Sequence, residues 1–127
     1  MSPFSILLRQ LRVSRRLKQK EMANHLGYEP SYISALERGN KGPPKQDFIN
    51  RFIQGLQLTE EEQATLAQAL RLSRRHISLP SRASEREYAL LHQLEPQLGH
   101  LSPLQIQLIE LALHIPAAQD HHVQPSV

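Results

Sequence analysis

Residues 17–44, with the sequence LKQKEMANHLGYEPSYISALERGNKGPP, decide how this chain folds. The first half predicts a short helix over residues 19–26, because apolar side chains recur at helical spacing and Gly27 is a typical residue after a helix end. After a turn that includes Pro30, the second half predicts another short helix that stops at Gly39. The expected inward-facing residues of the two helices are Met22, Ala23, Leu26, Ile33 and Leu36.

Helical spacing continues on both sides of this stretch, and no segment has a convincing strand pattern. Upstream, apolar residues at 4, 7, 8 and 11 predict a first helix. This Arg-rich start also has the composition of an organelle transit peptide, but its pattern runs directly into the next helix, which disfavours that alternative. Downstream, Thr59 and Glu62 form a capping box between two further helices. Their expected inward residues are Phe48, Ile49, Phe52, Ile53 and Leu56, then Leu66, Leu70 and Leu72.

Two short helices around a tight turn, the second ending in Glu-Arg-Gly, form a helix-turn-helix pattern. The chain here resembles the Cro/lambda-repressor-like family, also called the Xre family. The matching residues are Leu17, Gln19, Met22, Ala23, Leu26, Gly27, Ile33, Ser34, Leu36, Glu37, Arg38, Gly39, Pro43 and Pro44. The resemblance implies an all-α fold with a five-helix DNA-binding domain over residues 1–75. It also implies a partly buried salt bridge between Arg12 and Glu37.

Contacts to double-stranded DNA are expected around this motif. A helix N-terminus favours an anionic group, and the family places a DNA-backbone contact at Gln19. Together with the basic and polar residues nearby, the expected phosphate contacts are Lys18, Gln19, Lys20, Ser34, Arg38, Asn40, Lys41 and Lys45. Lys18 stands where the family usually has a Ser or Thr N-cap, so we expect more fraying there. By family register the base-reading positions are Glu29, Pro30, Ser31, Tyr32 and Ala35.

Charge divides the chain into two parts. The net charge of +3 combines +6 over residues 1–58 with −3 over residues 76–127. Residues 76–83 are predicted to be a linker, residues 84–115 a helical hairpin interrupted at Pro96 and Gly99, and residues 116–127 a disordered tail. The second hairpin helix is apolar on nearly every side, so a second copy is expected to cover it. The expected dimerisation residues are Tyr88, Leu91, Leu94, Leu104, Leu108, Ile109, Leu111 and Ile115.

The composition excludes several function classes. The absence of cysteine excludes disulfides, thiol catalysis and cysteine-ligated metals. The seven histidines lack ligand spacing, so neither a metal nor another cofactor is expected. No catalytic motif occurs, and no apolar run reaches the roughly 20 residues of a bilayer span. The sequence therefore predicts a non-enzymatic regulator of bacterial, phage or plasmid origin, cytoplasmic and nucleoid-associated when bound to DNA. It is most simply a dimeric repressor that binds an inverted-repeat operator. The alternatives are an antitoxin whose C-terminal part binds a toxin, and a protein-binding helical adaptor.

Overall fold

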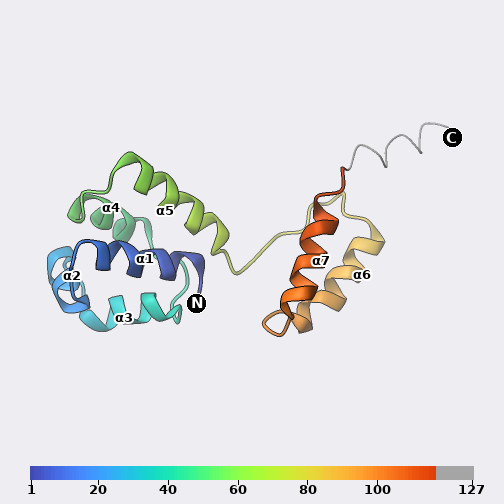
Figure 1. Ribbon diagram of the computed structural model, residues 1–127, viewed down its shortest axis with the longest axis horizontal. Helices are drawn as coiled ribbons and strands as arrows, with labels where there is room; N and C mark the ends of the chain where they lie inside the picture. Colours follow the sequence, from blue (N-terminus) through green and yellow to red (C-terminus); the bar gives the residue numbers. More distant parts are fainter. Residues whose placement is uncertain (117–127) are drawn as a thin grey trace. The chain divides into compact units, whose positions relative to one another are not determined.

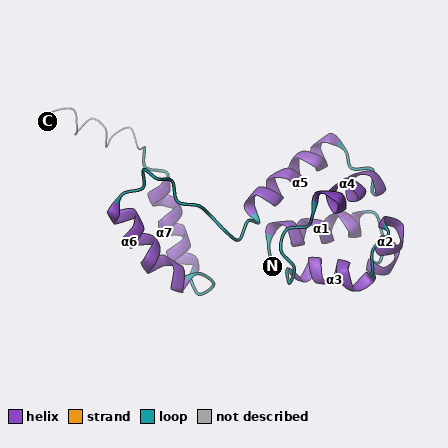
Figure 2. Cartoon of the chain, turned by 180° about the vertical axis from the view of Figure 1, so that it is seen from behind, coloured by secondary structure: helices purple, strands orange, loops and turns teal. Residues whose placement is uncertain are grey.

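The computed structural model describes residues 1–116, which are helical throughout apart from turns and loops and contain no strand, as the all-α prediction required (Figures 1 and 2). The chain divides into two compact units, Met1–Ser78 and the part from Leu79 onward. The helices of the first unit are α1 Pro3–Ser14, α2 Gln19–Leu26, α3 Pro30–Arg38, α4 Gln46–Gly55 and α5 Glu60–Leu72. Those of the second are α6 Glu85–Leu94, the 3₁₀ helix η1 Glu95–Gln97 and α7 Pro103–Leu113.

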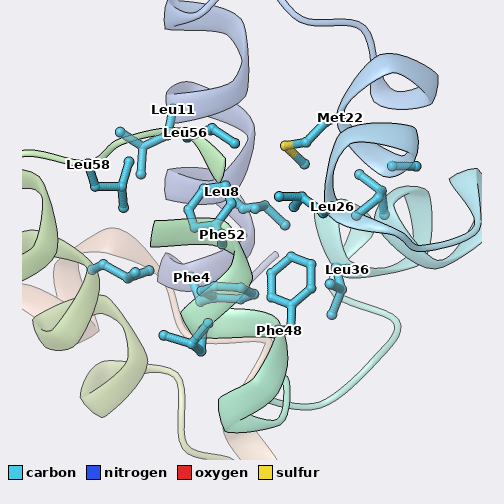
Figure 3. Close-up of a cluster of buried hydrophobic side chains, with 14 residues drawn as sticks. Phe4, Leu8, Leu11, Met22, Leu26, Leu36, Phe48, Phe52, Leu56 and Leu58 are labelled. Atoms are coloured by element: carbon cyan, nitrogen blue, oxygen red, sulfur yellow. The ribbon is translucent and has the colours of Figure 1, made fainter. Parts of the chain in front are cut away.

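The first unit has a continuous apolar core. Helix α1 packs against α3 and α5, while α2 packs against α3 and α4. Two stacked rings, Phe48 and Phe52, lie at the centre of this core with their centroids 5.8 Å apart (Figure 3). All five helices contribute, as their spacing predicted, and the fully buried apolar side chains with the largest volumes are Phe48, Phe52, Leu8, Met22, Ile33, Leu36 and Leu66.

A buried hydroxyl closes the first unit where α5 ends. The Ser73 hydroxyl accepts a hydrogen bond from the Phe4 amide at 2.8 Å and donates one to the Ala69 carbonyl at 2.6 Å. It therefore satisfies a backbone donor in the first turn of α1 and joins the two ends of the unit. The prediction that Leu72 faces inward was wrong, because this side chain is 62% exposed. The last turn of α5 buries Ser73 instead.

The ends of α2 and α3 follow their sequence signals. Gly27 and Gly39 have φ angles of +82° and +76°, in the left-handed region that favours glycine. At the start of α2, Lys18 provides no side-chain cap, as its residue type implied. The Glu21 carboxylate accepts a hydrogen bond from the Lys18 amide at 2.8 Å, so one half of a capping box remains.

Up to residue 116, the second unit is a helical hairpin without a core of its own. Capping boxes from Ser84 and Ser102 start its two α-helices, and Pro96 lies in η1, where the predicted interruption occurs. None of the residues in α6, η1 or α7 is buried. Between α6 and α7 lies an open groove of about 300 Å³, lined mainly by leucine and glutamine. No described helix is long and apolar enough to span a membrane. Of the predicted tail, residues 117–127 lie outside the described part.

An ion pair joins the first turn of α5 to the end of α1. The Arg15 guanidinium donates to both carboxylate oxygens of Glu62, at 2.6 and 2.7 Å. Glu62 also accepts the Thr59 amide at 2.9 Å, completing the predicted capping box. The Arg15 hydrogen bonds, with help from Thr59, lower the pKa of the Glu62 carboxyl from 4.5 to about 2.

We therefore predict an acid-dependent loss of stability that depends on Glu62. A carboxyl whose pKa is lower in the folded state stabilises the fold above its unfolded value of 4.5, and this contribution disappears as the pH falls to about 2. The variant Glu62→Gln keeps an acceptor for Thr59 but loses the charge. In urea titrations, the stability advantage of the wild type over this variant should be full at pH 7 and vanish between pH 5 and pH 2.

Glu61→Gln is the matched control, because Glu61 lies in the same first turn and forms no ion pair within residues 1–116. The difference in the free energy of unfolding between Glu61→Gln and the wild type should change much less with pH. If the wild type stays more stable than Glu62→Gln by the same free energy down to pH 2, the role assigned to the Arg15–Glu62 pair is contradicted.

Candidate nucleic-acid interface

A tight turn sets the geometry of α2 and α3. The amides of Gly27 and Tyr28 both donate to the Ala23 carbonyl, each at 2.9 Å, so the end of α2 is closed before the chain reverses. Helix α3 then begins at Pro30, a favourable first residue because a first-turn amide has no partner within the helix. Two helices joined by three residues, with the second resting across the first, form a helix-turn-helix.

An ion pair locks α3 onto the other helices. The Arg12 side chain donates to Glu37 from Nε at 2.6 Å and from Nη2 at 3.0 Å, and its third nitrogen donates to the Leu17 carbonyl at 2.7 Å. The side chains are only 11% and 4% exposed, which confirms the partly buried salt bridge implied by the resemblance. A buried carboxylate requires such partners, so the orientation of α3 relative to α1 is tightly specified.

Gln19 joins the same network from the N-terminus of α2. Its side-chain amide donates to Glu37 Oε1 at 3.0 Å, a contact between residues 18 positions apart in the chain. The amide is therefore held in place, with its carbonyl and second N–H left for another group. Lys18 and Lys20 lie on either side of it and are exposed. Two exposed cations thus surround an oriented amide at a helix N-terminus, which is an arrangement suited to a phosphate.

An aromatic cluster supports the first turn of α3. The Tyr28 and Tyr32 rings stack with centroids 5.2 Å apart, and both pack against Phe48. The Arg51 guanidinium lies 5.2 Å above the Tyr28 ring, and the Tyr28 hydroxyl donates to Asp47 at 2.8 Å. Tyr32 is therefore a half-buried packing residue as well as a predicted base-reading one, and burial raises the pKa of its phenol.

The remaining predicted contacts divide by exposure. Glu29, Pro30 and Ser31 are exposed at the start of α3, whereas Ala35 is half-buried one turn later. The predicted phosphate contacts at the other end lie partly on α3 and partly in the loop to α4. Ser34 is half-buried and accepts a hydrogen bond from the Arg38 guanidinium, and the fully exposed members of this set are Arg38, Asn40, Lys41 and Lys45. Along α3 and this loop, exposed cations thus follow a first turn that carries mostly short or neutral side chains.

Sequence reasoning missed two features of this surface. The first is the stacking of Tyr28, in the turn before α3, on Tyr32 in its first turn. The second is Arg75, whose guanidinium donates to the carbonyl of Gly39 at the end of α3. These two residues are 36 positions apart, and no local pattern identifies the pairing. Within the described chain, no group of three His, Asp or Glu side chains is placed to hold a metal.

Comparison with known proteins agrees with this geometry. The sequence profile of the family described as "Helix-turn-helix domain" matches residues 3–66, half of the chain. The uncharacterized HTH-type transcriptional regulator RghRB of Bacillus subtilis (strain 168) is 36% identical over 61 residues. That alignment covers 48% of this chain and 44% of the relative, so the chain matches less than half of the relative's length. No solved structure gives a significant match.

We predict that neutralising Glu37 destabilises the first unit strongly. Glu37→Gln leaves the Arg12 charge partly buried without its counter-ion, and breaking such a pair costs about 3 kcal/mol. The measurement is the free energy of unfolding in urea, followed by circular dichroism.

Two further variants test the cause. Glu29→Gln removes the same charge from an exposed position without a side-chain cap, and its effect should stay within about 0.5 kcal/mol. The double variant Arg12→Met/Glu37→Met leaves no unpaired charge and should recover much of the loss. A double variant as unstable as the sum of its single variants would show that the two side chains are not energetically coupled.

Proposed function

This chain belongs to the helix-turn-helix domain family, and we propose that it is a sequence-specific DNA-binding transcriptional regulator that acts as a homodimeric repressor. The observation that carries the proposal is the locked α3, which is held by the Arg12–Glu37–Gln19 network while Pro30 and Ser31 are exposed at its start. A helix held in this way can enter the major groove, whose roughly 12 Å width accepts one helix. The similarity to a protein named as a transcriptional regulator supports the same conclusion.

The contacts in this proposal fall into two classes. Backbone contacts come from the oriented Gln19 amide and from exposed cations at both ends of the motif, and they fix the register without reading sequence. Base contacts come from the first turn of α3, where Ser31 is the exposed residue that both donates and accepts. Tyr32 and Ala35 contribute apolar contact, and Glu29 suits a cytosine amino group. We place the remaining specificity in the shape of the DNA, because no side chain here makes a bidentate base contact of the Arg or Gln type.

Dimerisation is proposed to occur through the hairpin of α6 and α7. A hairpin this short, below about 40 residues, rarely folds without a metal, a disulfide or a partner, and no residue of its helices is buried. On α7, Leu104, Leu108 and Leu111 follow the spacing of four and three that is typical of helix–helix seams, and Ile115 lies two residues beyond the end of the helix. These side chains are 57–63% exposed. Two hairpins paired about a two-fold axis would bury them as a four-helix bundle.

A two-fold dimer has a geometric consequence for DNA. It would present two copies of α3 to successive major grooves, about 34 Å apart on one face of the duplex, and so would bind an inverted repeat. Repression then follows sterically, because a dimer bound across a promoter excludes polymerase. The promoter of its own gene is the operator that we propose to examine first.

We predict that the full chain protects two inverted half-sites in a DNase I footprint of the DNA upstream of its gene. Ser31→Ala should reduce discrimination at one base pair in each half-site by 1–3 kcal/mol, or about 5- to 150-fold. Lys41→Ala serves as the comparison, since loss of a phosphate contact weakens binding to all sequences about equally. Equal effects of the two variants on specific and random DNA would contradict base reading by α3.

A second prediction concerns the oligomeric state. Light scattering should show a dimer for the full chain and a monomer for the fragment 1–83, which keeps the whole core of the first unit and should remain folded. Leu108→Glu should also produce a monomer, because it places a charge in the seam on α7. Gln107→Glu adds the same charge beside the seam and should leave the dimer intact.

The wild type decides between the alternatives. A full chain that remains monomeric at high concentration contradicts the dimer. If the chain instead forms a stable complex with a small protein encoded beside it, the antitoxin alternative is favoured.

A further inference from the structure

A basic segment, residues 73–84, follows α5 and belongs to neither the helix-turn-helix nor the hairpin helices. It contains three arginines and no acidic residue. Two of the arginines, Arg74 and Arg75, lie directly after the last turn of α5 and are exposed. They still belong to the first compact unit, which extends to Ser78. Their position relative to α3 is therefore part of the fold of that unit.

Two contacts hold this segment beside the end of α3. The buried Ser73 hydroxyl fixes the start of the segment to the Phe4 amide. The Arg75 guanidinium then donates to the carbonyl of Gly39, which caps α3 (Figure 1 shows the chain leaving α5 near the end of α3). The loop that carries Asn40 and Lys41 begins at the next residue. The basic segment thus lies against the loop that we propose to contact phosphates.

The charges of the two segments add to one another. Arg38, Lys41 and Lys45 come from the end of α3 and its loop, and Arg74 and Arg75 come from the end of α5. Neither residues 38–45 nor residues 73–78 contain an acidic side chain. No acidic side chain within these two ranges offsets the five charges, so their mutual repulsion is unfavourable for the isolated protein and favourable for binding a polyanion.

A purely structural role does not account for both arginines. Arg75 satisfies a carbonyl at a helix C-terminus, and a cation is favourable there. One hydrogen bond occupies one of the five N–H groups of its guanidinium and leaves four others. Arg74 is exposed and forms no hydrogen bond or ion pair with any residue in the described range. Within the described residues, its guanidinium is therefore not engaged by another side chain.

We propose that Arg74 and Arg75 form a second DNA-backbone contact, which extends the phosphate-binding surface from the loop after α3 onto the segment after α5. Arg75 spans the two, with one side of its guanidinium on Gly39 and the other toward a phosphate. The contact is to phosphate and not to bases, so it adds affinity without changing the sequence that is read. This inference rests on the proposed DNA-binding function.

The test is the salt dependence of DNA binding by the full chain. For duplex DNA, the slope of log K against log salt concentration is negative, and its magnitude decreases by about 0.9 for each phosphate contact that is lost. Reductions of the slope below refer to this magnitude. Arg74→Ala should therefore reduce the slope by about 0.9 per protomer, or about 1.8 for a dimer on its operator. Arg75→Lys keeps the charge and should leave the slope nearly unchanged, whereas Arg74→Ala/Arg75→Ala should reduce it further than Arg74→Ala alone.

Arg86→Ala is the matched control, since it removes one arginine from an exposed position on α6 in the second unit and should not change the slope. An unchanged slope in Arg74→Ala/Arg75→Ala, with wild-type binding intact, overturns this inference alone. If the double variant binds DNA more weakly but with an unchanged slope, the inference is also overturned, because the segment then affects binding through the fold and not through a phosphate contact. A wild-type chain that binds no DNA at any salt concentration overturns the proposed function, and this inference with it.

Discussion

The rest of the structure depends on the buried carboxylate of Glu37. It is 4% exposed and lies on the second helix of the motif, so its charge must be matched from inside the fold. Arg12 supplies the counter-charge from α1, and Gln19 supplies a further donor from α2. One ionised group thereby fixes three helices relative to one another. Apolar packing alone specifies such an arrangement less sharply, because it tolerates small rotations that a bidentate ion pair does not.

The two units solve the problem of stability in different ways. The first buries a core of fourteen apolar side chains, and no buried polar side-chain atom in the described residues lacks a partner. The second has well-capped helices but buries nothing, although α7 consists largely of leucine and isoleucine. Local signals and capping boxes are therefore sufficient to start its helices, while the burial that would stabilise them is missing from residues 79–116. This contrast is the physical basis for assigning DNA contact to one unit and self-association to the other.

The sequence predicted features that depend on neighbours in the chain. Apolar spacing and the capping signals at Thr59, Ser84 and Ser102 placed the helices, because these interactions span no more than four residues. The Arg12–Glu37 pair, 25 positions apart, required the family resemblance. Spacing alone assigned Leu72 to the core, since it carries no information about the hydroxyl of Ser73, which the fold buries instead. The contact from Arg75 to Gly39 depends on how α5 closes against α1, which no local pattern encodes.

The rigidity of the motif affects how α3, which carries few side chains suited to base contacts, would select its DNA under the proposed function. The first turn of α3 offers one exposed hydroxyl, a proline and a carboxylate, and the ring of Tyr32 is held by Tyr28 and Phe48. Side chains of this kind gain little energy from individual bases. They still discriminate if the backbone contacts hold the helix at one depth and angle, because DNA that must deform to meet those contacts does so at a sequence-dependent cost. Under the proposed function, the buried ion pair therefore contributes to specificity without touching DNA, by preventing α3 from adjusting to the wrong duplex.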